Sequence, residues 1–372
     1  MIYIFSFTIC IYFAFLASYK KENKKLVVGT LETFFVFLSL FPLFMLYAFR
    51  GSVGIDYYSY IDIFNVVQYA QLKDLIRLSS ELEKESLFLF VNYVGFKLGL
   101  GINFVYFFCA TITFYFFYKA ITYYDFSRKY LIVSIIIFNS QIFFFGLDAV
   151  RQIPAVMIYF YATKYIHKRK IYKFLLWVFI ASAFHTSALL LIPTYFILHK
   201  NIKTLVYIPL CLTCLFLSVV FKPLMLVEVI EKIAPNWKYI KYMYDDVSYE
   251  GTVGVVYFIH LITCIVISVL KKEKNNDNRK EILVNMYLFF TMLFPLLTPF
   301  LSTKRFLFYF WIGMTLGVPF GIEKLKNSRL KRYLNLILFI YCLIFTFLFL
   351  SSIRSGYLHP EWLHEPYKFI FM

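Results

Sequence analysis

Long apolar stretches separated by short polar connectors run through almost the whole chain, and they predict a bundle of membrane-spanning helices. Most stretches are continuous for roughly 17 to 23 residues, the length that a helix needs to cross a bilayer. A β-barrel would instead show alternating segments of about ten residues. About twelve helices are predicted, over residues 2–18, 26–48, 103–123, 130–146, 149–166, 171–184, 187–198, 203–221, 253–270, 282–300, 306–321 and 333–350.

The positive charges predict how these helices are oriented. The net charge is +17, and most of the cations lie in short clusters between apolar stretches. Such clusters mark the cytoplasmic side of a membrane, so the charge indicates topology and not nucleic-acid binding. The predicted cytoplasmic connectors are residues 20–25, 128–129, 164–173, 199–203, 271–280 and 323–332.

The remaining connectors are then expected to face outward. We predict one integral membrane domain over residues 1–372, with a first outer loop at 49–98, a larger one at 222–252 and an outer C-terminal tail at 351–372. Residues 86–98 are too short for a span and follow a charged stretch, so an interfacial helix is expected there.

The composition excludes a soluble domain with a single core. Hydrophobic residues make up 61% of the chain and aromatic residues 22%, which is the composition of an integral membrane protein. All six cysteines lie in apolar stretches, so no disulfide framework is expected. The CxxC spacing of Cys211 and Cys214 falls within one such stretch, where packing is the favoured role.

A first group of polar residues begins the first outer loop. Arg50 ends an apolar stretch, and Asp56, Tyr57 and Tyr60 follow it. Asp and Tyr side chains supply the hydrogen-bonding groups and stacking faces that a sugar needs. The alternative is an ordinary loop whose arginine extends to the membrane surface.

A second group lies around Arg151 and Gln152. Pro154 suits the first turn of a helix, so Arg151 and Gln152 are expected near a helix N-terminus. An arginine there opposes the helix dipole unless an anion is bound as well, and a phosphate would satisfy both side chains. The alternative partner for Arg151 is Asp148, three residues earlier.

Two further groups complete the candidates. His185, Thr186 and Ser187 interrupt an apolar hairpin, where an ionisable side chain implies a function or a hydrogen-bonding partner on a neighbouring helix. Lys304 and Arg305 form a basic pair on the expected outer side, against the positive-inside trend. Lys304 could extend to lipid headgroups, whereas Arg305 could turn into the bundle.

The other polar features favour no cofactor. Asp245, Asp246 and Glu250 show no recognised calcium-ligand spacing and are expected to form a solvated face. The chain has no P-loop, dinucleotide-binding glycine motif or zinc pattern.

At these four groups the chain resembles the EpsG family of bacterial exopolysaccharide proteins and, with it, the Wzy-type polymerases of O-antigen and capsule. The matching residues are Arg50, Gly51, Gly54, Asp56, Tyr57, Tyr60, Gly146, Arg151, Gln152, Ala155, Phe184, His185, Ser187, Ala188, Leu189, Lys304 and Arg305. The chain departs from the pattern around Asp148 and Pro154. The resemblance implies a multi-pass protein of the bacterial inner membrane with a glycosyltransferase-C-like helical fold. Its active site would face the periplasm.

The resemblance also implies the reaction, in which lipid-linked oligosaccharide repeat units on undecaprenyl diphosphate are both donor and acceptor. Arginines would neutralise the diphosphate without a metal or other cofactor. The expected diphosphate-binding residues are Arg50, Arg151, Arg305 and Gln152, and the expected catalytic residues are Asp56, His185, Arg151 and Arg305. Asp56 and His185 both remain candidates for the base, and Tyr57 and Tyr60 would line the sugar site.

Two other functions fit these residues. A flippase would move the lipid-linked unit across the bilayer without lengthening it, and an O-antigen ligase would require lipid A core as acceptor. The expected partners are the lipid-linked glycan, membrane lipids and a chain-length regulator protein, with no nucleic acid.

Overall fold

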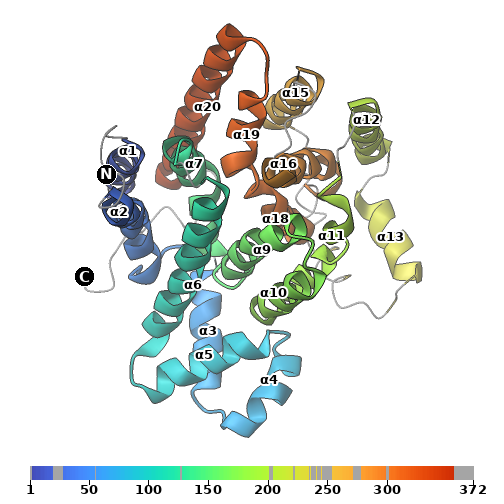
Figure 1. The fold of residues 1–372 in the computed structure, drawn as a ribbon. Coiled ribbons are helices and arrows are strands. Elements are labelled where there is room, and N and C mark those ends of the chain that lie inside the picture. Colours follow the sequence, from blue (N-terminus) through green and yellow to red (C-terminus); the bar gives the residue numbers. More distant parts are fainter. Residues whose placement is uncertain are drawn as a thin grey trace. The chain divides into compact units, whose positions relative to one another are not determined.

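The computed structural model describes residues 2–19, 28–54, 56–125, 128–200, 204–220, 223–233, 235, 240, 244, 254–270, 278–298 and 301–355. Over these ranges the chain is helical and forms no β-strand (Figure 1), which confirms the predicted all-α class. The predicted connector 20–25, most of 271–280, most of the outer loop 222–252 and the tail beyond residue 355 lie outside the described residues. Their placement therefore stays a prediction.

Five helical segments of the described chain are long and apolar enough to cross a membrane, and a bent helix pair would make a sixth span. They are Leu31–Ala48, Gly101–Tyr124, Leu131–Asp148, Arg279–Leu297 and Ser328–Ser351, with Arg305–Trp311 and Met314–Glu323 as the bent pair. The remaining apolar helices have 10–17 residues, so they extend about 15 to 26 Å at 1.5 Å per residue, short of a 30 Å hydrocarbon core. The predicted total of twelve spans depends on these shorter helices and stays a prediction.

The described residues form two compact units, residues 1–195 with 336–372 and residues 196–335. The first unit contains α1 (Ile2–Ser18), α2 (Val28–Ala48), α3 (Tyr57–Val67), η1 (Leu72–Asp74), α4 (Leu75–Glu81), α5 (Ser86–Lys97), α6 (Gly101–Tyr124), α7 (Leu131–Ile137), η2 (Phe138–Ile142), α8 (Phe143–Asp148), α9 (Gln152–His167), α10 (Ile171–Phe184), η3 (Thr186–Leu191) and most of α20 (Ser328–Ser355). The short helix α11 (Thr194–Ile197) crosses the boundary between the units.

Helix α9 is the central element of the first unit. It packs between α6 and α10, and α6 packs in turn against α2, which lies along α1 (Figure 1). Most residues of α9 are buried, as expected for a helix that is apolar on nearly every side. The N-terminus of α9, where Arg151 lies, is therefore held by packing.

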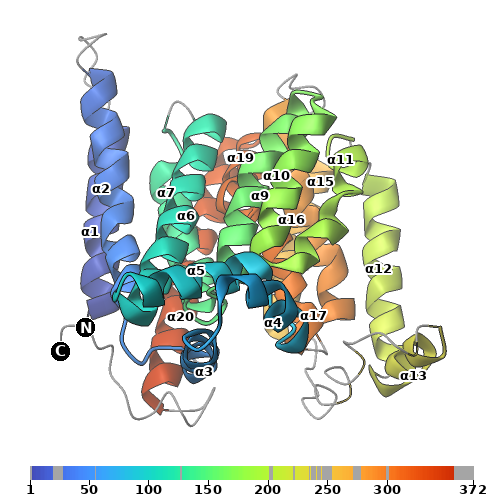
Figure 2. The same ribbon diagram turned by 90° about the horizontal axis from the view of Figure 1, so that it is seen from below.

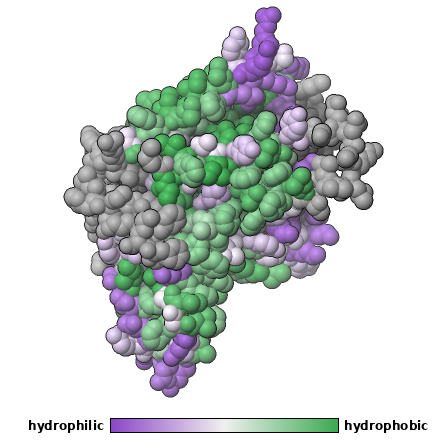
Figure 3. All heavy atoms as spheres, turned by 90° about the vertical axis from the view of Figure 1, so that its left-hand side faces the viewer, coloured by the Kyte–Doolittle hydropathy of each residue, from purple (hydrophilic) through white to green (hydrophobic). Residues whose placement is uncertain are grey.

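The outward face of α1 and α2 is apolar. Phe5 and Phe15 on α1 and Phe34 and Phe37 on α2 are all exposed, and Figure 3 shows hydrophobic residues over much of this side of the molecule. Such a face suits contact with lipid, because the exposure of so much apolar surface to water would be unfavourable in free energy.

Three short helices form a layer at one end of α6. Helix α5 lies against α6 and α10, while α3 and α4 pack on α5 (Figure 2). The apolar faces of these helices share one core, which includes Tyr60, Ile63, Leu75 and Phe88. The expected helix at residues 86–98 is thereby confirmed as α5, whereas α3 and α4 were not predicted. Its interfacial location stays a prediction.

One predicted helix, residues 130–146, is divided by a π-helical turn, η2. Asn139, Ser140 and Gln141 are buried there, and the Tyr341 hydroxyl of α20 donates to Gln141 Oε1 at 3.2 Å. A π-turn adds a residue within a helix and redirects the side chains that follow. It places three polar side chains inside the unit instead of facing lipid.

The second unit contains α12 (Thr204–Val220), α13 (Pro223–Ile233), α15 (Val255–Leu270), α16 (Asn278–Leu297), α17 (Leu301–Lys304), η4 (Arg305–Leu307), α18 (Phe308–Trp311), α19 (Met314–Glu323) and the first residues of α20. Helix α16 packs against α12, α15 and α19. The predicted helix at 306–321 is instead bent by 40° at a break between α18 and α19. Ion pairs of Lys280 with Glu323 and of Lys324 with Glu281 connect the start of α16 to the end of α19.

Candidate functional site

Arg50 lies two residues after the end of α2, inside the first unit, with only 2% of its surface exposed. Its Nη1 donates to the backbone carbonyl of Leu147, and its guanidinium lies 4.3 Å from the centre of the Tyr106 ring. Both contacts favour a delocalised planar cation. Arg50 therefore connects the first polar group to the segment just before Arg151, which belongs to the second group.

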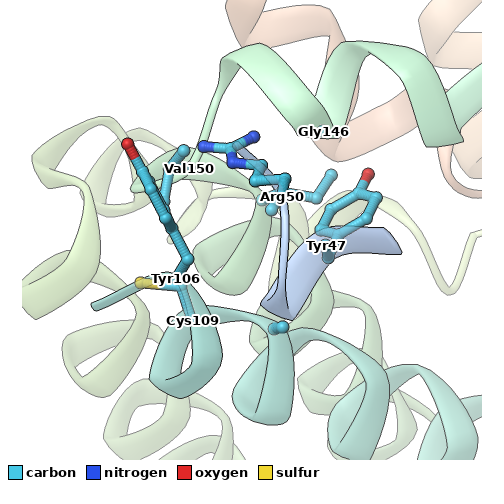
Figure 4. A pocket seen from close by; sticks show the side chains of 8 residues that line it. Tyr47, Arg50, Tyr106, Cys109, Gly146 and Val150 are labelled. Atoms are coloured by element: carbon cyan, nitrogen blue, oxygen red, sulfur yellow. The ribbon is translucent and has the colours of Figure 1, made fainter. Parts of the chain in front are cut away.

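A small cavity adjoins this arginine. Its volume is about 10 Å³, and its lining includes Tyr47, Arg50, Tyr106 and Gly146 (Figure 4). The Nε and Nη2 atoms of Arg50 are buried and have no hydrogen-bond partner within the described part of the chain. The cavity is about large enough for one water molecule, so a diphosphate could reach Arg50 only if these residues moved apart.

The loop after Arg50 packs directly on the segment before Arg151. Gly54 has a φ of +105°, and a Cβ added there would lie 2.9 Å from Asp148 Oδ1 and 2.9 Å from the Leu147 carbonyl oxygen. The Tyr60 hydroxyl donates to the Asp148 carbonyl oxygen at 3.1 Å. Glycine is needed because both the conformation and the close approach exclude a side chain.

Asp56 and Tyr57 begin α3 beside this contact. Asp56 is the residue before the helix, and its side chain makes no capping hydrogen bond, although aspartate is a preferred capping residue. Tyr57 stacks on Tyr106, with ring centres 6.0 Å apart and ring planes at 25°. The Tyr106 ring is therefore in contact with both the Arg50 guanidinium and the Tyr57 ring.

Arg151 precedes the first turn of α9 and forms an ion pair through Nη1 with Oε2 of Glu85. The side chains are 16% and 7% exposed, respectively, and the guanidinium lies 5.6 Å from the Phe88 ring centre. Its partner thus comes from the residue just before α5, and not from Asp148, the partner offered by the sequence. The Glu85 carboxylate therefore occupies the position beside Arg151 where the sequence predicted a bound phosphate.

The other oxygen of Glu85 binds the third polar group. Thr186 N–H donates to Glu85 Oε1 at 3.0 Å, and one residue away His185 Nδ1 lies 2.6 Å from Ser187 Oγ. One carboxylate therefore holds both the Arg151 segment and the His185 turn. Glu85 was not among the predicted site residues, because it stands in a charged stretch that indicated only an interfacial helix after it.

Electrostatics keep Glu85 ionised. Burial raises the pKa of Glu85. The nearby Arg151 and His185 and the Thr186 N–H lower it by more than burial raises it, so the pKa lies below its usual range. Burial, with the positive charge of Arg151, also lowers the pKa of Lys84. The site therefore holds charges of both signs close together.

The remaining predicted residues occupy two places. Gln152 is buried in the first turn of α9, next to Arg151. Arg305 begins η4 in the second unit and is partly buried, as is Lys304 at the end of α17. Burial lowers the pKa of Lys304, which does not fit a fully solvated lysine. The structure thus brings three of the four groups together and places the fourth in the other unit.

No group of three histidine, cysteine, aspartate or glutamate side chains within the described ranges could hold a metal ion.

Comparison with protein families agrees with the resemblance seen in these groups. The family model for the EpsG family matches residues 32–362 and so spans all four polar groups. The chain belongs to the EpsG family. EpsG proteins are Wzy-like membrane proteins of the polysaccharide-polymerase type. Neither the curated proteins nor the solved structures gave a match.

Proposed function

We propose that this EpsG-family protein polymerises oligosaccharide repeat units carried on undecaprenyl diphosphate, and so makes O-antigen or a capsular or exopolysaccharide. The observation that best supports this is the carboxylate of Glu85, which pairs with Arg151 and accepts from the Thr186 N–H next to His185. An arginine is suited to binding phosphate and a histidine to proton transfer. Membership of the family supplies the reaction class.

The proposed reaction transfers the growing glycan from one lipid diphosphate to the sugar of a second lipid-linked unit. A hydroxyl of the acceptor attacks the anomeric carbon, the bond from that carbon to the diphosphate oxygen breaks, and undecaprenyl diphosphate leaves. Arg151 and Arg305, together with Arg50 and Gln152, would bind the diphosphate and stabilise its developing negative charge. Arginines would thus perform the neutralisation that a metal ion performs elsewhere.

A base must take the proton of the acceptor hydroxyl, and the two candidates are those named from the sequence. Asp56 immediately precedes α3, and His185 Nδ1 lies 2.6 Å from Ser187 Oγ. A carboxylate or an imidazole can perform this step at neutral pH. We propose that one of them does, and the pH dependence of polymerisation by Asp56→Asn and His185→Gln variants distinguishes them.

The two tyrosines divide into different roles. Tyr60 is 5% exposed and its hydroxyl is bonded to the Asp148 carbonyl, so it holds the loop in place. Tyr57 is partly exposed and offers a ring face for stacking against a sugar. Of the two, Tyr57 is the one that we propose touches the substrate.

The proposed setting is the bacterial inner membrane, with the site on the periplasmic side. The positive-inside pattern supports this orientation. We retain about twelve crossings and a glycosyltransferase-C-like arrangement as part of the proposal, together with a chain-length regulator as protein partner.

The test uses membranes or purified protein with lipid-linked repeat units. Wild-type protein should build long glycan chains, whereas Arg151→Ala and His185→Ala should not. Arg77→Ala is the matched control, because this arginine is 73% exposed on α4. If the two site variants still build long chains, the assignment of the site is wrong. Transport of the unit without elongation would indicate a flippase, and a requirement for lipid A core would indicate a ligase.

A further inference from the structure

Glu85 uses both carboxylate oxygens, and each one binds a different segment of the first unit. Oε2 pairs with Arg151 at the start of α9, and Oε1 accepts from Thr186 N–H at the start of η3. The Glu85 side chain is only 7% exposed. A buried carboxylate is costly unless it is paired in this way, so its position is fixed by these two partners.

The three segments that meet at Glu85 are also held by packing between their helices. Helix α5, which begins directly after Glu85, contacts α10, whose end leads into His185. The ring centre of Phe88, in the first turn of α5, lies 5.6 Å from the Arg151 guanidinium. The carboxylate therefore extends from a fixed helix, and it can hold the two partners at a fixed separation.

We propose that Glu85 is a positioning residue that sets Arg151 relative to the His185 turn for the glycosyl transfer. This inference rests on the function proposed above. Glu85 accepts a hydrogen bond from Nη1 of Arg151, and this bond, together with the Phe88 ring nearby, restricts the orientation of the guanidinium. It also neutralises the cation until the diphosphate arrives, and it fixes the backbone next to His185.

The first measurement does not depend on activity. Hydrogen–deuterium exchange is followed in the peptide covering residues 184–191, for wild-type protein and for Glu85→Ala and Glu85→Gln in detergent or nanodiscs. Glu85→Ala removes the acceptor of Thr186 N–H, so exchange should become faster by about tenfold. Glu85→Gln retains an oxygen acceptor and should exchange at close to the wild-type rate. Glu81→Gln is the control, because this glutamate is 57% exposed on α4.

The second measurement separates positioning from folding. Glu85→Gln should lower kcat and kcat/KM together by about ten- to a hundredfold, because it lacks the charge that orients Arg151 in the transition state. In the wild type, activity should fall at acid pH as Glu85 becomes protonated. The pH profile of Glu85→Gln should lack this fall. Glu85→Asp, which keeps the charge on a shorter side chain, should recover part of the rate.

The outcomes distinguish this inference from the proposed function. If wild-type protein makes no polymer, the proposed function fails, and the exchange measurement still decides whether Glu85 holds the turn. If polymer forms but Glu85→Gln has the wild-type kcat and pH profile, the positioning role is wrong. Unchanged exchange in Glu85→Ala, or faster polymerisation in Glu85→Gln, would overturn it as well.

Discussion

The carboxylate of Glu85 and the guanidinium of Arg151 form a buried ion pair between residues 66 positions apart in the chain. No local sequence spacing relates the two residues. They meet because α5 and α9 both pack against α6. The Glu85 carboxylate also accepts a hydrogen bond from Thr186 N–H, which holds the His185 turn beside the ion pair. The geometry of this candidate site therefore depends on how three helix ends are held together.

The stability of the protein should depend on pH through Glu85. Its pKa in the folded protein is below its usual range, so the fold favours the ionised form. The resulting stability is present above the usual carboxyl pKa of about 4 and is lost as the pH falls through the lower folded value. The difference in melting temperature between wild type and Glu85→Gln should therefore be largest near neutral pH and shrink below about pH 4.

The exposed Glu81 provides the control for this pH dependence. Glu81→Gln should follow the wild-type curve at every pH, because an exposed pair with Arg77 contributes little. A difference between wild type and Glu85→Gln that stayed constant down to acid pH would show that the charge of Glu85 does not contribute.

Arg151 and Glu85 should show strong coupling in a double-mutant cycle. Arg151→Ala leaves a buried carboxylate without its cation, which should cost about 3 to 5 kcal/mol in the free energy of unfolding. Adding Glu85→Gln removes that orphan charge, so the double variant should lose less than the sum of the two single losses. Denaturant unfolding in detergent measures the four stabilities, and additive losses would contradict a direct pair.

Gly54 should tolerate no side chain. Gly54→Ala forces alanine to a φ of +105° and brings its Cβ within 2.9 Å of Asp148 Oδ1, so we expect a loss of about 1 to 3 kcal/mol in stability and a loss of polymer formation. Gly99→Ala is the matched control, because Gly99 also has a positive φ but no atom within 4 Å of the added Cβ. Equal effects of the two changes would mean that the contact with Asp148 is unimportant.

The orientation of the first unit can be tested by cysteine labelling. Ser59 lies on the exposed side of α3 and Lys170 in the exposed turn before α10. In intact spheroplasts an impermeant thiol reagent should label Ser59→Cys and not Lys170→Cys, whereas lysed membranes should label both. Labelling of Lys170→Cys alone in intact spheroplasts would reverse the proposed topology and place the site on the cytoplasmic side.

The helices themselves were largely predictable from local sequence. The boundaries of α1 and α10 agree with the predicted ranges 2–18 and 171–184, because an apolar stretch bounded by polar residues is a local signal. The π-turn at Phe138–Ile142 and the break between α18 and α19 were missed, since the flanking sequence stays apolar through both. Only packing against neighbouring helices shows where such a helix bends.

For the site, the sequence alone determined which residues are polar exceptions in an apolar chain, and with them Arg50, Arg151 and His185 as candidates. An ionisable side chain within a membrane has a high free-energy cost, so such residues can be recognised as functional candidates from the sequence alone. The tertiary structure alone decided their partners: Glu85 for Arg151 and Thr186, and the Leu147 carbonyl for Arg50. An ion pair or hydrogen bond acts over a few ångströms, so it is settled by helix packing and cannot be derived from positions along the chain.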